Sequence, residues 1–303
     1  MTNKSKGTYA DEKIKRLRKK LLYYYKNKNF RAAERVGEAL LISYDRFNLP
    51  KTLAYEDDMF NTAVANQKAG HIEHAIGLYS DVLDLVFDRA GPNLLVAECL
   101  TNLGSLLVCY GEDLEYKEGG CRLLMQALTI RGLCLHHEHA EIGDALYNVG
   151  NALARFGKYK EALIAFKTAM GIYTKCQSDY LINCLYVIAA AHEKLDEYEE
   201  AYPYVETARY GLANKSEEEY HRAGYYLAYL YEMTGRNFDS CNLYISVMNW
   251  LEKAVGCKHP SYIDAATRVV RQKVKLGRYN EAEALIKRME SFNVFIKGFP
   301  LKP

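Results

Sequence analysis

Hydrophobic and small residues recur at intervals of three and four along most of the chain, whereas strand-like alternation is nearly absent. In the stretch "LYNVGNALARFGKYKEALIAFKTAM" (146–170), they form two runs that are separated at Gly157. This spacing is typical of amphipathic helices that bury one face. The pattern therefore predicts an all-helical protein that is built from pairs of helices.

One small residue in the second helix of each pair recurs throughout the chain. The spacing from one occurrence to the next is 39 to 45 residues, and the positions are Ala33, Ala75, Gly120, Ala162, Ala201, Cys241 and Ala282. The longest spacing contains an insertion in "GEDLEYKEGG", which we assign to a turn. A nearly constant period over the whole chain predicts about seven repeated units.

Glycines mark a second shared position, where the first helix of a pair must stop. They are Gly70, Gly111, Gly157, Gly235 and Gly277. We expect each of them to take the left-handed conformation that ends a helix, because glycine adopts it without steric cost.

Residues 146–170 resemble the tetratricopeptide repeat. The matching positions are Leu146, Val149, Gly150 and Leu153 on the first helix and Ala162, Phe166 and Ala169 on the second. Residues 256–289, "GCKHPSYIDAATRVVRQKVKLGRYNEAEALIKRM", resemble the longer unit of the kinesin light chain type. The resemblance implies an all-α fold, a right-handed α-solenoid (superhelix) of about seven helix-turn-helix repeats.

We expect residues 1–303 to form a single domain of this kind. Residues 1–12 are expected to be a flexible N-terminus, residues 13–290 the repeats, and residues 291–303 a tail whose Phe292 and Phe295 cover the last unit or extend away from it. In "KIKRLRKKLLYYY", the helical spacing of Ile14 and Leu21 favours a capping helix with an exposed basic face over a nuclear-import or nucleic-acid signal. Asp57 and Asp58 are expected to face the positive end of a helix dipole.

The resemblance also implies an inner groove, lined by the first helix of each unit, that recognises a peptide. One groove position holds Phe60, Thr101, Tyr147, Tyr186, Tyr225 and Thr267, and the next holds Asn61, Asn102 and Asn148. An asparagine amide can bind a peptide backbone because it both donates and accepts hydrogen bonds. The tyrosines could instead pack between helices with only the hydroxyl in water.

Basic residues extend this face. They are Arg155 and Lys194, next to Asn151, and a stripe of Arg268, Arg271 and Lys275 in the last unit. Together with the aromatic positions they indicate a partner segment that is acidic at one end and aromatic or apolar in the middle. The alternative is that these cations are simply favoured near helix C-termini by the helix dipole.

A histidine cluster in "LCLHHEHAEI" (133–142) raises the possibility of a metal site formed by Cys134, His136, His137, Glu138 and His139. These residues are crowded together without the separated pairs that are usual for zinc ligands. His139 and His259 both lie 23 residues before the small residue of the following second helix. The cluster is therefore interpreted as a joint between repeats, with metal binding as the weaker alternative.

Composition narrows the function classes. The net charge of +2 gives no global reason to expect nucleic acid or an anionic membrane as partner, and no apolar run is long enough to span a bilayer. The eight scattered cysteines and the lack of a signal peptide favour the cytoplasm. No catalytic or nucleotide-binding motif is present. We expect a non-enzymatic scaffold without cofactor that binds a protein or peptide; the alternatives are a peptide-responsive receptor of the bacterial type and, less favoured, a metal protein or enzyme.

Overall fold

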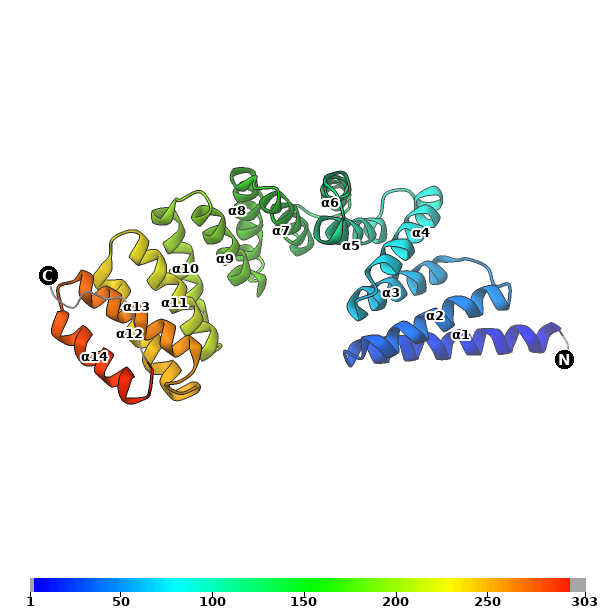
Figure 1. Cartoon of the computed structure of the whole chain (residues 1–303). Coiled ribbons are helices and arrows are strands. Elements are labelled where there is room, and N and C mark those ends of the chain that lie inside the picture. Colours follow the sequence, from blue (N-terminus) through cyan, green and yellow to red (C-terminus); the bar gives the residue numbers. More distant parts are fainter. Residues whose placement is uncertain (1–2, 295–303) are drawn as a thin grey trace. The chain divides into compact units, whose positions relative to one another are not determined.

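The computed structural model describes residues 3–294, with side chains from Tyr9 onward except those at positions 88 and 90 (Figure 1). These residues form helices joined by turns, and none of them is in a strand. The helices are α1 (Asn3–Lys26), α2 (Phe30–Arg46), α3 (Leu53–Ala69), α4 (Ile72–Ala90), α5 (Leu94–Tyr110), α6 (Leu114–Cys134), α7 (Ala140–Arg155), α8 (Tyr159–Lys175), α9 (Tyr180–Glu193), α10 (Tyr198–Leu212), α11 (Glu217–Met233), α12 (Asn237–Ala254), α13 (Pro260–Lys275) and α14 (Tyr279–Ser291). The prediction of an all-helical chain is confirmed for this part of the protein.

The chain divides into two compact units. Unit 1, Met1–Phe156, contains α1 to α7, and unit 2, Gly157–Pro303, contains α8 to α14. Within each unit every helix packs against the next one in the sequence, and in unit 1 α5 also contacts α7. Among the residues that the structure describes, no helix is both long and apolar enough to cross a membrane.

The repeat register is confirmed. Each predicted small residue lies on the second helix of a pair and is buried: α2, α4, α6, α8, α10, α12 and α14 carry Ala33, Ala75, Gly120, Ala162, Ala201, Cys241 and Ala282. At Gly120 a Cβ atom would lie 2.6 Å from the carbonyl oxygen of Gly104, and a Cβ on Gly104 would lie 2.8 Å from that of Gly120. The small residue is therefore needed because the backbones of α5 and α6 approach so closely.

The glycine expectation holds at four of five positions. Gly70, Gly157, Gly235 and Gly277 have φ between 72° and 94°. It is wrong at Gly111, where φ is −55°. A Cβ atom there would lie 2.5 Å from the carbonyl oxygen of Leu107, so this glycine relieves a close approach after α5.

The first helix is longer than expected. It begins at Asn3, so most of the segment 1–12, which was expected to be a flexible N-terminus, is helical. Ala10 is buried, and the ring of Tyr9 lies 6.0 Å from that of Phe47, so contacts with α2 and its C-terminal turn support this extension.

At the C-terminal end of the described residues Phe292 is half-buried, whereas Phe295 lies outside them.

The basic N-terminal helix agrees with the capping interpretation. Ile14 and Leu21 are buried in the core of unit 1, while Lys15, Lys19 and Lys20 are exposed. The apolar spacing of this helix thus orients these three lysines toward solvent, whereas Arg18 is only partly exposed.

Candidate functional site

A first hollow of about 350 Å³ lies between α3 and α5 in unit 1. Phe60 and Lys68 of α3 line it together with Thr101 and Asn102 of α5, and Tyr25 of α1 adds a second aromatic ring. Aromatic rings beside a primary amide present an apolar surface and a group that both donates and accepts hydrogen bonds. The structure thus brings the predicted residues Phe60 and Asn102 into one site.

A buried guanidinium sets the polar side of this hollow. Arg131 of α6 is only 7% exposed, and it donates to the hydroxyl of Thr101 at 2.7 Å and to the carbonyl oxygen of Ala97 at 3.3 Å. Desolvation raises the pKa of the neighbouring Glu98, and the charge of Arg131 partly offsets this shift. The hydroxyl of Thr101 is therefore already hydrogen-bonded within the protein. Of the predicted groove residues that line this hollow, Asn102 is the one with a side-chain amide.

A second hollow of about 570 Å³ lies between α5 and α7. Asn148, Asn151 and Arg155 follow one another at helical spacing on α7 and line it together with Ser105 and Cys109 of α5. None of the three α7 side chains has a hydrogen bond or ion pair with any residue that the structure describes. Two amides and one guanidinium thus face a hollow with their hydrogen-bonding capacity unused.

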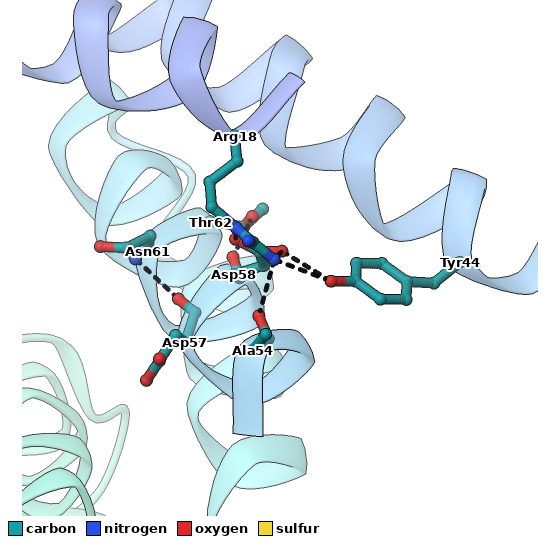
Figure 2. Close-up of polar contacts among 7 residues, drawn as sticks. All are labelled: Arg18, Tyr44, Ala54, Asp57, Asp58, Asn61 and Thr62. Carbon is teal, nitrogen blue, oxygen red and sulfur yellow. Dashed lines mark hydrogen bonds and ion pairs between the residues drawn. The ribbon is translucent and has the colours of Figure 1, made fainter. Parts of the chain in front are cut away.

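Asn61 does not join either hollow. Its side-chain nitrogen donates to the carbonyl oxygen of Asp57 at 2.7 Å, one turn earlier in α3 (Figure 2). This bond uses one of the donors with which a free amide would bind a peptide backbone. Asn61 therefore differs from Asn148, although both were predicted at the same repeat position.

A buried ion pair in unit 1 was missed by sequence reasoning. Asp58 was expected to face a helix dipole, but this is wrong: its carboxylate is 1% exposed and is bound by Arg18 of α1 and Tyr44 of α2 (Figure 2). A signal was available, because Arg18 stands between Ile14 and Leu21 at the spacing of a buried helical face. Charged residues on such a face are almost always paired.

The predicted tyrosines of unit 2 are partly buried. Tyr186 of α9 packs against the apolar cluster that includes Ala189 and Val205, and burial raises its pKa. Tyr225 of α11 packs edge-on against Tyr244 at a ring distance of 5.3 Å and donates its hydroxyl to Asp264. These rings contribute to helix packing as well as to the surface. The third tyrosine predicted at this groove position, Tyr147 of α7 in unit 1, is also half-buried.

The basic stripe of the last unit is largely neutralised. Glu232 of α11, whose side chain is 9% exposed, accepts hydrogen bonds from Lys275 at 2.9 Å and from Arg268 at 3.5 Å. Arg271 is exposed and has no such partner among the described residues, and Lys194 likewise is exposed at the end of α9. An acidic partner would therefore meet fewer free cations here than the sequence suggested.

The histidine cluster lies at a helix joint. His139 is the N-cap of α7 and accepts a hydrogen bond from the backbone nitrogen of Glu141 at 3.3 Å, and His259 caps α13 in the same way at 3.2 Å from Ser261. His136, His137 and Glu138 are exposed, with possible ligand atoms within 4.8 Å of one another. Three exposed groups resemble no closed structural zinc site. The shared capping role supports the joint interpretation.

The comparisons with known proteins agree with this architecture. No family model and no curated protein matches the sequence. Among solved structures, apo RapI has a TM-score of 0.61 with 14% identity, over 92% of this chain and 96% of that chain. A Rap protein complexed with competence and sporulation factor has a TM-score of 0.57 with 18% identity, over 90% of this chain and 72% of that chain. A kinesin light chain with TPR-like repeats from Podosopora anserina has a TM-score of 0.54 with 18% identity, over 65% of this chain and 94% of that chain. The chain therefore has the α-solenoid fold of tetratricopeptide-type repeat proteins.

Proposed function

We propose that this protein is a non-enzymatic binding module that holds an extended peptide segment of a partner protein across the hollows of unit 1. The observation that carries this proposal is the row of Asn148, Asn151 and Arg155, whose polar groups face the second hollow without partners in the described structure. Asn148 and Asn151 are half-buried, and polar groups that are removed from water normally find hydrogen-bond partners; Arg155 is exposed. A bound peptide backbone and an acidic side chain would supply them.

The chemistry of the two hollows suggests the composition of the segment. Arg155 suits a carboxylate, because its planar guanidinium can bind two oxygens at once. Phe60 and Tyr25 suit an aromatic or apolar side chain, and Asn102 suits a peptide group. Binding would occur on preformed helices, so little ordering of the protein would oppose it.

The proposal that the module is not an enzyme rests on the groups that the hollows contain. Cys109, which lines the second hollow, has no histidine or carboxylate partner among the described residues. A nucleophile needs an adjacent base or a lowered pKa to be effective. Amides, aromatic rings and guanidinium groups are suited to recognition instead.

A display library of random peptides tests the proposal. Peptides selected on the wild-type chain should lose most of their affinity for the variant Asn148→Ala/Asn151→Ala/Arg155→Ala. A matched control is Glu115→Ala/Glu118→Ala/Arg122→Ala on α6, whose side chains are exposed and lie outside both hollows. If the α7 variant keeps its helical circular dichroism and binds the selected peptides as well as the control does, the proposed site is wrong.

A peptide-responsive receptor is the second candidate, because one similar structure is a Rap protein complexed with competence and sporulation factor. A receptor differs from a scaffold in that the peptide shifts a conformational equilibrium. Small-angle scattering with and without a selected peptide separates the two: a change in the radius of gyration at saturation favours a receptor, and an unchanged value favours a scaffold.

A further inference from the structure

A third hollow, of about 800 Å³, lies within unit 2 between the first halves of α11 and α13 and the second half of α12. We refer to it as the α11–α13 hollow. His221, Tyr225 and Trp250 give it an aromatic wall, and Val247 and Leu251 give it an aliphatic one. Its size is that of a site for a few amino-acid side chains.

The aromatic wall contains an unused polar atom. The ring of His221 stacks on that of Trp250 at 4.9 Å with an interplanar angle of 13°. Burial lowers the pKa of His221, so the imidazole is neutral at neutral pH. Its Nδ1 atom is buried and has no hydrogen-bond partner in the described structure. A peptide segment placed on this wall would cover the stacked rings.

The rim of the hollow is acidic. The first turn of α11 carries Glu217, Glu218 and Glu219, and Glu218 lines the hollow itself. Two cations lie nearby: Arg222, which lines the hollow and is paired with Glu219 at 3.6 Å, and Arg209, whose charge acts on His221. An apolar segment that carries positive charge therefore complements both the wall and the rim.

Residues 295–303 have this composition. They read "FIKGFPLKP", with the large apolar side chains Phe295, Ile296, Phe299 and Leu301, two lysines and no acidic residue. The residue before them, Val294, packs against the same apolar cluster as Trp250 and Cys257. Nine extended residues span about 30 Å, and neighbouring helices are about 10 Å apart. The segment is thus long enough to pass the start of α13 and reach the hollow.

We propose that residues 295–303 bind in the α11–α13 hollow of the same chain, with apolar side chains on the aromatic wall and Lys297 or Lys302 at the acidic rim. A tethered segment has an effective concentration on the order of millimolar. Any outside ligand of similar composition must therefore compete with it. This proposal concerns unit 2 alone and does not depend on the binding function proposed for unit 1.

Trp250 is the only tryptophan of the chain, so its fluorescence reports on this hollow. The test compares the full wild-type chain with a full chain that carries Phe295→Ser, Phe299→Ser and Leu301→Ser. We expect the emission of the variant to shift to the red and its quenching by acrylamide to increase. Adding the synthetic peptide FIKGFPLKP to the variant should reverse both changes. In the wild-type chain, the protection of Trp250 from acrylamide should be independent of protein concentration, because the contact is made within one chain.

Two variants locate the site. Glu218→Gln in the chain with the serine substitutions should weaken binding of the peptide by about two- to fivefold, the loss expected for an exposed charge pair. Ala254→Arg, at an exposed position that lines the hollow, should abolish binding through bulk and like charge, whereas Ala213→Arg at the end of α10 should not. Equal quenching of wild type and serine variant, a peptide that binds equally well after Ala254→Arg, or protection that disappears on dilution would each overturn the proposal.

Discussion

The guanidinium of Arg18 on α1 holds the buried carboxylate of Asp58 on α3 through two hydrogen bonds of 2.6 and 2.7 Å (Figure 2). Tyr44 of α2 donates to the same carboxylate at 2.9 Å, so one ionic group connects three successive helices. Paired donors of this fixed geometry suit a carboxylate better than a single ammonium would.

Arg18→Ala should destabilise unit 1. The substitution leaves the carboxylate of Asp58 buried without its cation, and because the side chain of Arg18 is 37% exposed, we expect a loss of about 2–3 kcal/mol, below the full cost of breaking a deeply buried pair. Chemical denaturation measures this loss. Arg16→Ala, at an exposed position on the same helix, should change stability by less than about 0.5 kcal/mol. Equal effects of the two substitutions would contradict a structural role for the pair.

Tyr44 should make stability depend on alkaline pH. Burial, and then the hydrogen bond to Asp58, raises the pKa of Tyr44 from 10.0 to about 12. The pKa of Tyr44 is higher in the folded than in the unfolded chain. The stabilisation that its protonated hydroxyl provides is therefore complete below about pH 10 and is lost as the pH rises toward 12. Unfolding free energies of wild type and Tyr44→Phe should therefore converge over this range, since the phenylalanine chain lacks the ionising group. Parallel pH profiles would show that the hydroxyl of Tyr44 is not buried as described.

Two adjacent glycines of α6 should respond oppositely to alanine. A Cβ at Gly120 would overlap the backbone of α5, whereas at Gly119 the nearest atom is the end of the Arg122 side chain at 3.7 Å. Gly120→Ala should lower the free energy of unfolding by about 1–3 kcal/mol through overpacking. Gly119→Ala should instead raise it by about 0.5–1 kcal/mol, because alanine is the better helix former. Thermal melts of the two variants decide this, and a stable Gly120→Ala protein would contradict the close approach of α5 and α6.

The two capping histidines should behave as a matched pair. His139→Ala and His259→Ala each remove the side-chain acceptor at a helix start and should cost about 0.5–2 kcal/mol. His137→Ala, in the exposed cluster, should cost nothing measurable. Added zinc or a chelator should leave the melting temperature unchanged. Stoichiometric zinc in the purified protein, lost on replacing His136 and His137, would instead support the metal-site alternative.

The repeat register could be predicted because its signals are local. Ala162 and Phe166 share one face of α8, and both are buried as their spacing requires. The same argument placed Asn148, Asn151 and Arg155 on one face of α7, and the structure places all three at one hollow. Which tyrosines belong to a binding surface was harder to predict, since Tyr225 also packs against Tyr244.

The sequence by itself therefore determined the helical class, the number of helix pairs and the burial of the repeated small residues, because periodicity and small residues act within one or two turns. Only the tertiary structure decided which charged side chains are free to bind a partner and which are paired within the protein. Lys275 is neutralised by Glu232, 43 residues away, and Arg18 by Asp58, 40 residues away. Such partners lie on neighbouring helices, and their pairing depends on how closely those helices pack, which no local spacing encodes.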